Sequence, residues 1–142
     1  MSLKKDFLLN KRLESDTFFI EDLPLCKFLL MNDSNYPWFL LVPRINGIKE
    51  LYELEEKDRA QLDFEIVEVS KFISSAFKPK KINIASLGNI VSQFHMHIIG
   101  RFVEDPSWPG PVWGAVDFNK YKSDEVDIII NLSRNFSKTL RA

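Results

Sequence analysis

The sequence predicts an α+β domain: one antiparallel sheet of about five strands, with a long helix and a C-terminal helix packed against it. Three observations support this fold class. Three short apolar segments separated by turn residues come first, and they are close enough for an antiparallel meander. One long amphipathic segment follows them. Two further apolar segments and a second helical segment complete the order.

The first three strands are predicted from short apolar runs. Residues 17–20 form the first, after a polar N-terminal segment that we expect to be helical or frayed. Residues 25–31 form the second, and the Asp22-Leu23-Pro24 step between them suits a tight turn. Residues 38–42 form the third and Pro43 ends it; because this strand is almost entirely apolar, we expect it to be central and buried on both faces.

The clearest helix spans residues 55–77. Its apolar side chains recur at spacings of three and four and form one stripe, made of Leu62, Ile66, Val69, Ile73 and Phe77. Acidic residues near its start suit the positive end of the helix dipole. The Lys78-Pro79-Lys80 step that follows is a stop signal.

Two more strands are expected at residues 82–85 and 94–101. A second helix follows from about 124 to 139, with Ser123 as its N-cap. Residues 104–114 lie between strand and helix. They are too rich in proline for regular structure and too rich in tryptophan for an idle linker.

Length and charge limit the classes of function. The 142 residues predict a single domain over 1–142. A net charge of −1 provides no basic field, so neither nucleic acid nor a membrane surface is expected as a partner. Cys26 is the only cysteine, so no intramolecular disulfide can form. Without a stretch that resembles a signal peptide or a membrane span, we expect a cytoplasmic protein.

Both histidines of the chain lie two residues apart, in the run from Gln93 to Ile99. In a β-strand, Gln93, His95 and His97 would share one face, and Phe94 would lie on the other. Histidine is the side chain best suited to proton transfer, metal ligation or nucleophilic attack near neutral pH. We therefore take this short run as the candidate site of chemistry.

Two alternatives to catalysis by the histidine pair need weighing. Catalytic zinc usually takes three protein ligands, and here a carboxylate would have to complete the site. The sequence has neither an H-E-x-x-H pattern nor a pair of cysteines. A purely structural pair is the second alternative, and clustered histidines are uncommon in cores. Nucleophilic or acid–base chemistry is favoured, and no metal or other cofactor is expected.

The run from Gln93 to Ile99 resembles the signature of the histidine triad (HIT) family, in which three histidines alternate with apolar residues. Other features agree in order along residues 17–101: Pro43-Arg44 ending an apolar strand, Leu51-Tyr52-Glu53-Leu54 before the long helix, and Gly88-Asn89 before the histidines. The resemblance makes 17–101 the core of a HIT-like fold. Residues 102–142 are then a Pro- and Trp-rich tail with the C-terminal helix.

The sequence is most similar to a bacterial branch of that family whose first motif histidine is glutamine, here Gln93. The branch tends to carry an asparagine–aspartate–x–x–tyrosine–proline–tryptophan loop and a tail rich in tryptophan and proline. Residues 32–38 match the loop, and residues 108–114 match the tail. Its members are often labelled diadenosine tetraphosphate hydrolases.

The resemblance implies a nucleotidyl hydrolase or transferase that is homodimeric and needs no metal. His95 would attack the α-phosphorus of a nucleotide, expected to be a purine nucleotide. Water would then hydrolyse the nucleotidyl-histidine. His97 would contact the phosphate and stabilise developing charge. The bond cleaved would be a phosphoanhydride, as in a dinucleoside polyphosphate, or a phosphoramidate.

Polar residues near the motif are candidate nucleotide contacts. The resemblance assigns the ribose hydroxyls to Asn32 or Asp33, although both residues also suit a loop for local reasons. Asn89 and Asn83 are expected near the phosphates, and a polar residue at the edge of a strand is the alternative for Asn83. Either Arg101 reaches a phosphate or it is a solvated surface arginine.

Two tryptophans of the tail, Trp108 and Trp113, either close over the base or anchor irregular chain. Gln93 is the departure from the family pattern, because its amide carries no titratable proton. A proton relay through this position is therefore lost. The sequence leaves two functions open: an active hydrolase, and a nucleotide-binding module with weak or lost catalysis.

Overall fold

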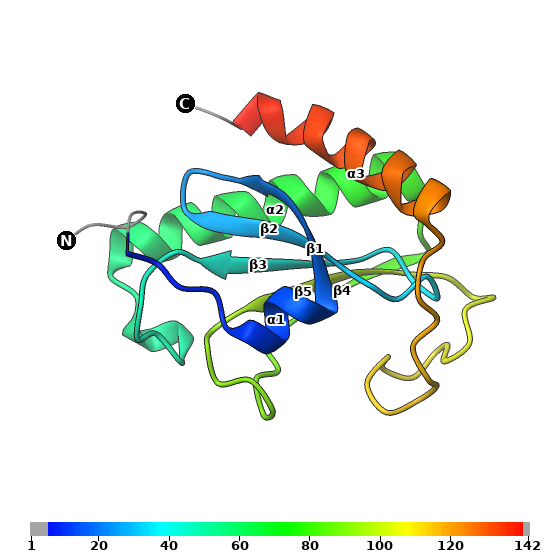
Figure 1. Ribbon diagram of the computed structural model, residues 1–142, viewed down its shortest axis with the longest axis horizontal. Helices are drawn as coiled ribbons and strands as arrows, with labels where there is room; N and C mark the ends of the chain where they lie inside the picture. The colour runs from blue at the N-terminus through cyan, green and yellow to red at the C-terminus, as the bar shows by residue number, and fades with distance from the viewer. Residues whose placement is uncertain (1–5, 141–142) are drawn as a thin grey trace.

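The computed structural model describes residues 6–140, and its strands form one antiparallel sheet in the order β1-β2-β3-β5-β4 (Figure 1). The predicted α+β fold is confirmed. The elements are α1 (Lys11–Asp16), β1 (Thr17–Asp22), β2 (Cys26–Met31), β3 (Trp38–Pro43), η1 (Leu51–Glu53), α2 (Glu56–Phe77), β4 (Lys81–Ala85), β5 (Met96–Arg101), α3 (Ser123–Ser137) and η2 (Lys138–Leu140).

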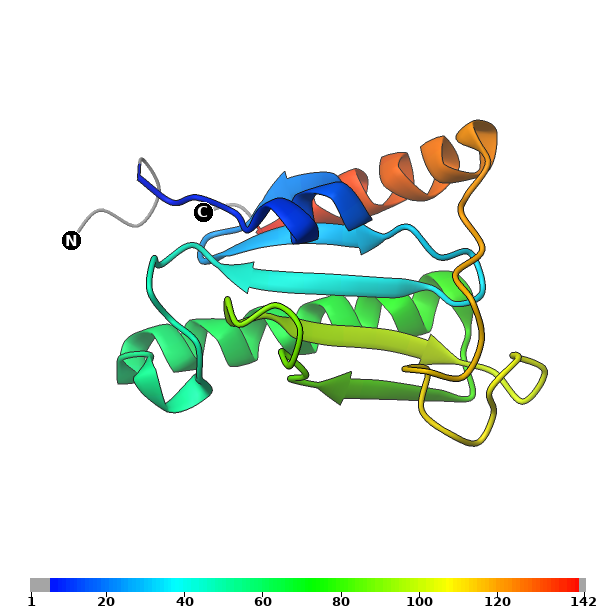
Figure 2. The same cartoon turned by 60° about the horizontal axis from the view of Figure 1, so that its bottom comes forward.

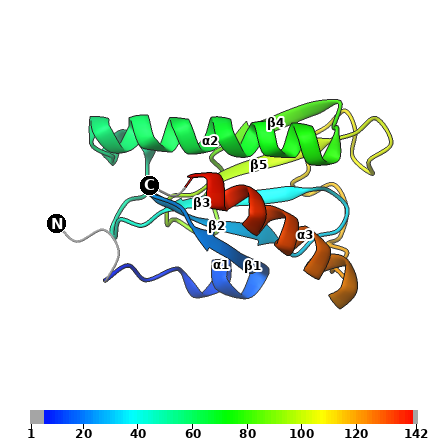
Figure 3. The same ribbon diagram turned by 90° about the horizontal axis from the view of Figure 1, so that it is seen from above.

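The two faces of the sheet are covered differently. Helices α2 and α3 lie over one face (Figure 3). The other face carries α1, the β4–β5 loop and the irregular chain before α3 (Figure 2). Strand β3 is buried along its whole length, as the sequence predicts, because it lies between β2 and β5 and under both layers.

The core under α2 and α3 contains most of the phenylalanines. Phe72 of α2 stacks on Phe136 of α3 with ring centroids 4.6 Å apart, and Phe28 contacts Phe39 within the sheet. Each large apolar side chain buried here stabilises the fold by roughly 1.5–3 kcal/mol. No helix within residues 6–140 combines the length and the apolar character needed to cross a membrane.

A buried carboxylate lies within the apolar stripe of α2. Glu65 accepts hydrogen bonds from the backbone amides of Leu25 (2.8 Å) and Cys26 (2.9 Å). On the same turn, the Arg44 guanidinium donates to the carbonyl of Leu23 at 2.7 Å and to that of Cys26 at 3.1 Å. Burial, followed by the charge of Glu65, raises the pKa of the Cys26 thiol. The β1–β2 turn is therefore held through its amides and its carbonyls together.

Two predicted boundaries are wrong in an informative way. Strand β5 begins at Met96 rather than at 94, because the chain leaves the ladder there and the Phe94 amide donates to the carbonyl of Ile48 instead. Helix α3 begins at Ser123 itself, and Lys122 occupies the N-cap position. The first boundary matters more, since it leaves His95 outside the strand and Gln93 three residues before it, so the two need not share a strand face.

Candidate active site

A cavity of about 380 Å³ lies on the face of the sheet opposite α2 and α3. It is lined by side chains from α1, β2, β3, β5, the β4–β5 loop and the chain before α3: Arg12, Leu13, Asp16, Met31, Trp38, Leu87, Asn89, Ile90, Val91, His95, His97, Trp113, Gly114 and Phe118. Both histidines therefore face the same cavity, and most of its wall is apolar.

His95 has a fixed tautomer. Its Nδ1 lies 2.7 Å from the backbone carbonyl of Gln93, and a carbonyl oxygen can only accept, so Nδ1 carries the proton. The unprotonated nitrogen is then Nε2. The side chain is 4% exposed, and burial lowers the pKa of His95, against the opposing effect of the Gln93 carbonyl. His95 is therefore neutral near pH 7, with a lone pair on Nε2.

His97 has the opposite tautomer. Its Nδ1 accepts the indole N–H of Trp38 at 3.0 Å, so the proton resides on Nε2. That nitrogen lies 3.3 Å from the carbonyl of Leu87, a long hydrogen bond. Burial, then the neighbouring His95, lowers the pKa of His97 to about 4. The centroids of the two rings lie 4.8 Å apart, so a ring with a free lone pair and a ring with an N–H donor are neighbours in one cavity.

Aromatic side chains form one wall of the cavity around His97. Its ring lies 5.0 Å from that of Trp113, and Trp38 lies 6.0 Å from Trp113 and 5.6 Å from Phe118. Trp113 therefore lies beside His97 in the wall of the cavity. The sequence places Trp38 at the end of the matched loop and the start of an apolar strand, without a role in the site. A buried indole N–H that needs an acceptor was the available signal for its second role.

The β4–β5 loop approaches His95 closely at Gly88. A Cβ on Gly88 would lie 2.8 Å from the carbonyl oxygen of Val91 and 3.8 Å from Cε1 of His95, so a larger residue would displace the loop. On this side lies a second, more polar cavity of about 180 Å³, lined by Lys49, Glu50, Ser86, Gly88, Asn89, Ser92, Phe94 and His95. His95 and Asn89 line both cavities, so the nucleophile candidate stands between an apolar and a polar space.

The side chain of Gln93 does not line the cavity of the histidines, contrary to the expectation of a shared strand face. Its Oε1 accepts from the amide of Asn10 at 2.8 Å, and its Nε2 donates to the carbonyl of Leu8 at 2.9 Å. The strand-face prediction is wrong because Gln93 precedes β5 and its side chain turns toward the N-terminal segment.

Asn32 and Asp33 also lie outside the lining of this cavity. The side-chain carbonyl of Asn32 accepts from the amide of Tyr121 at 3.0 Å. The buried carboxylate of Asp33 accepts from the amide of Asn119 at 3.1 Å and from the side chain of Asn35 at 2.8 Å. Of the two expected roles, these contacts favour the shaping of the loop, which they tie to the chain before α3.

Arg101 belongs to a separate buried cluster. It is 1% exposed and donates to both carboxylate oxygens of Asp105, at 2.8 and 3.0 Å, and to the side chain of Asn83 at 2.8 Å. Its guanidinium also lies 5.5 Å from the Tyr36 ring and 5.9 Å from the Trp108 ring. Arg101 is therefore not a solvated residue. Together with Asn83 and Trp108, it anchors the chain after β5 and does not line the cavity of the histidines.

Several lining residues were not anticipated from the sequence. Arg12, Leu13 and Asp16 come from α1, in the segment that we expected only as helical or frayed, and Met31 comes from the end of β2. Phe118 comes from irregular chain before α3. None carries a motif or a spacing that points to a site, because each reaches the cavity only through tertiary packing.

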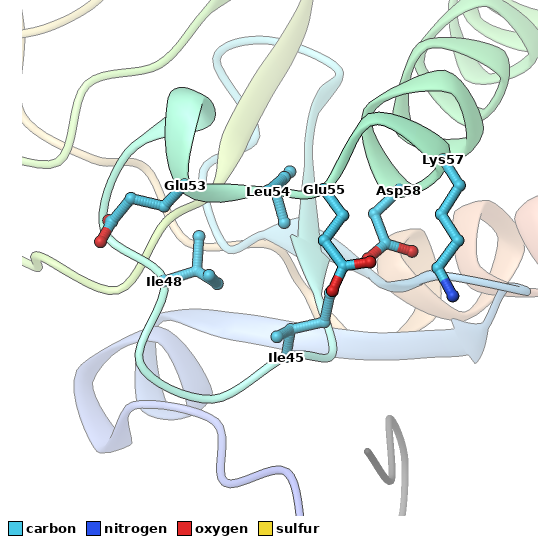
Figure 4. Close-up of a pocket in the computed structure, with 7 residues that line it drawn as sticks. All are labelled: Ile45, Ile48, Glu53, Leu54, Glu55, Lys57 and Asp58. Atoms are coloured by element: carbon cyan, nitrogen blue, oxygen red, sulfur yellow. The ribbon is translucent and has the colours of Figure 1, made fainter.

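Other parts of the described chain offer neither a metal site nor a second pair of histidines. Within residues 6–140, no three His, Cys, Asp or Glu side chains gather in a way that could hold a metal ion. A cavity of about 230 Å³ at the start of α2 is lined by acids, a lysine and apolar residues (Figure 4). Its Glu53 carboxylate already accepts from the amides of Lys49 and Glu50, which lowers the pKa of Glu53.

Comparisons with known proteins converge on one family. The model of the HIT domain family matches residues 12–104. A histidine triad protein of known structure from Bradyrhizobium japonicum is 45% identical, with 91% of this chain and 96% of that chain covered and a TM-score of 0.89. One from Marinobacter aquaeolei VT8 is 40% identical (94% and 98% covered, TM-score 0.92). One from Sinorhizobium meliloti 1021 is 43% identical (89% and 94% covered, TM-score 0.88). A comparison with curated proteins found no significant match.

Proposed function

The chain belongs to the HIT domain family, and from this membership and the geometry of its two histidines we propose that it is a nucleotidyl hydrolase acting through a covalent nucleotidyl-histidine. One observation carries the proposal: the opposite tautomers of His95 and His97 in one cavity. A nucleophile needs a free lone pair, and a phosphate needs hydrogen-bond donors. His95 offers the first and His97 the second.

The first step is the attack of His95 on a nucleotide bound in the cavity. The Nε2 lone pair forms a bond to the α-phosphorus while the bond to the bridging atom breaks, and that electron pair departs with the leaving group. The ring becomes cationic, and the Gln93 carbonyl, which already accepts the Nδ1 proton, stabilises that charge. His97 donates from Nε2 to a phosphate oxygen in place of the Leu87 carbonyl.

The second step releases the nucleoside monophosphate. Water attacks the same phosphorus, the phosphorus–nitrogen bond breaks, and the electron pair returns to Nε2 of His95. One proton of the water passes to bulk solvent, and the other stays on the new oxygen of the monophosphate. Asn89, which lines both cavities, is well placed to orient the phosphate or the water through its amide.

The lack of a side chain that could protonate the leaving group favours one class of substrate. Gln93 has no titratable proton, and His97 is neutral above about pH 4. A phosphate chain departs as an anion and needs no proton, whereas an amine is a poor leaving group unless it is protonated. We therefore propose a phosphoanhydride, such as a dinucleoside polyphosphate, in preference to a phosphoramidate.

A nucleotide-binding module with weak or lost catalysis is the second candidate, and Gln93 favours it. The amide is committed to the backbone of the N-terminal segment and supplies nothing to a reacting group. In this case the cavity would hold a purine nucleotide without releasing product.

One experiment separates the two candidates. The protein is mixed with a diadenosine polyphosphate and with an adenosine phosphoramidate, and mononucleotide release and adduct mass are followed. A hydrolase gives release that His95→Ala abolishes and an adenylyl adduct on His95, with the anhydride preferred. Tight binding of AMP by calorimetry, without any release that depends on His95, supports the binding module and contradicts the hydrolase.

Family membership also supports a homodimer as part of the proposal. Strand β4 is an edge of the sheet, and Ile84 on it is 48% exposed. Phe64 and Val67 on α2 are similarly exposed. Apolar side chains at an unpaired strand edge suit pairing with a second copy. Sedimentation velocity tests this proposal: a dimer is expected, and a monomer at micromolar concentration contradicts it.

A further inference from the structure

We propose that Gln93 is a positioning residue: its side-chain amide holds the N-terminal segment 6–10 so that α1 forms the nucleoside-binding wall of the cavity. This inference rests on the proposed function for the identity of the ligand. It assigns the glutamine that replaces the first motif histidine a role in nucleotide affinity, and it assigns the ribose hydroxyls to Asp16.

The first support is the pairing of the Gln93 amide with the chain. Its carbonyl oxygen accepts from the Asn10 amide while its nitrogen donates to the Leu8 carbonyl, so both groups bind alternate residues on one side of the segment. A neighbouring strand would offer the same donor and acceptor. The two nitrogens of a histidine ring point in diverging directions, so a histidine cannot make this pair of contacts.

A second side-chain amide, that of Asn46, also binds the backbone of segment 6–10. Asn46 accepts from the Leu8 amide at 3.2 Å and donates to the Asp6 carbonyl at 2.6 Å. Leu8 is therefore held by its N–H and its carbonyl while its side chain remains 78% exposed. Apolar burial does not fix this residue, so the two amides hold its backbone. Its neighbours Phe7 and Leu9 pack against the sheet.

The segment leads directly into the wall of the cavity. The Asn10 side chain caps α1 by accepting from the Arg12 amide at 2.8 Å, and Leu13 of α1 is buried. Arg12 and Asp16 line the cavity of the histidines. Freeing the Gln93 contacts would loosen Asn10, the cap, and with it the position of α1.

Asp16 offers the nucleoside the contact that Asn32 and Asp33 do not supply. Its carbonyl accepts the Asn32 amide at 3.0 Å, which places α1 beside the end of β2. Its carboxylate forms an exposed ion pair with Arg12 at 3.4 Å, and such a pair contributes little and is easily exchanged. A carboxylate at the rim of a nucleotide cavity is well suited to accept the hydrogen bonds of a ribose diol.

The test measures kcat and KM for a diadenosine polyphosphate in Gln93→Ala, Gln93→His, Asn46→Ala and Asp16→Asn. Asn135→Ala, an exposed amide on α3, is the matched control. We expect KM to rise about tenfold in all four with kcat within about twofold, because a lost binding contact raises KM alone. Gln93→His, which restores the family motif, is expected to behave like Gln93→Ala.

A second measurement distinguishes local loosening of segment 6–10 from destabilisation of the whole fold. Hydrogen exchange at the amides of Leu8 and Asn10 is expected to accelerate in Gln93→Ala while exchange in α2 is unchanged. A fall in kcat with KM unchanged, or rescue by Gln93→His, overturns the proposal. So does unchanged exchange. If the wild-type protein releases no nucleotide, the proposed hydrolase fails. The role of Gln93 in nucleotide affinity is then tested by the Kd for AMP in the same variants, which is expected to rise about tenfold.

Discussion

At the scale of single residues, the candidate site depends on hydrogen bonds that fix which ring nitrogen carries a proton. The Trp38 N–H can be accepted only by an unprotonated Nδ1, so it holds His97 as a neutral ring with its donor at Nε2. Protonation of His97 would place two N–H groups against each other. This contact joins β3 to its neighbour β5 in the sheet, although the two residues lie 59 positions apart in the sequence.

The substitution Trp38→Phe tests this contact. It keeps the ring but removes the donor, so we expect the pKa of His97 to rise above about 4 and kcat to fall about tenfold. Proton NMR titration of the His97 ring checks the first result, and steady-state kinetics check the second. An unchanged His97 titration would show that the indole N–H does not set its protonation state.

The low pKa of His97 also predicts a pH dependence of stability. The ring is protonated near pH 6.5 in the unfolded chain but only near pH 4 when folded. As pH falls below 6.5, the unfolded state binds a proton that the folded state does not, so the free energy of unfolding falls and levels off below pH 4. This residue accounts for up to about 3 kcal/mol of that loss.

Urea denaturation at about pH 7 and about pH 4.5 measures this loss. His97→Gln, which keeps an acceptor for the Trp38 indole, is expected to lose less stability between the two values than the wild type does. Equal losses in both proteins would assign the acid sensitivity to other groups.

At the scale of elements, the β1–β2 turn depends on a side chain of α2, a helix that follows it by about forty residues in the sequence. Glu65→Ala leaves the amides of Leu25 and Cys26 buried without an acceptor, which costs about 2–5 kcal/mol. Thermal or urea unfolding measures this loss. Glu68→Ala is the control on the same helix, since its pair with Lys71 lies at the surface (26% and 72% exposed) and contributes less than about 1 kcal/mol. Similar losses in the two variants would show that the turn does not need its carboxylate.

Elements with periodic patterns were predictable, and their polar attachments were not. The stripe on α2 and the apolar run of β3 placed both elements correctly, because burial of one face leaves a record in neighbouring residues. Glu65 lies inside the same stripe without disturbing it. Its partners are about forty residues away, and no local pattern encodes a contact at that separation.

At the scale of the whole molecule, the motif identified the two histidines but not the rest of their cavity. His95, His97, Asn89 and Trp113 line it, and their roles stay predictions. Arg101 was misjudged because its partner Asp105 lies in irregular chain, where the sequence gives no geometry. The α1 wall was missed for a related reason: a six-residue helix has too few turns to show a period.

The central position of β3 predicts the order in which nucleotide affinity and turnover are lost on heating. Trp38 lies in the strand that both halves of the sheet pair with, so the His97 contact persists until the sheet itself comes apart. The N-terminal segment, held by two surface amides, opens at lower cost. Warming should therefore weaken nucleotide affinity first, while loss of turnover at saturating substrate coincides with global melting. Heat inactivation well below the melting temperature would contradict this order of events.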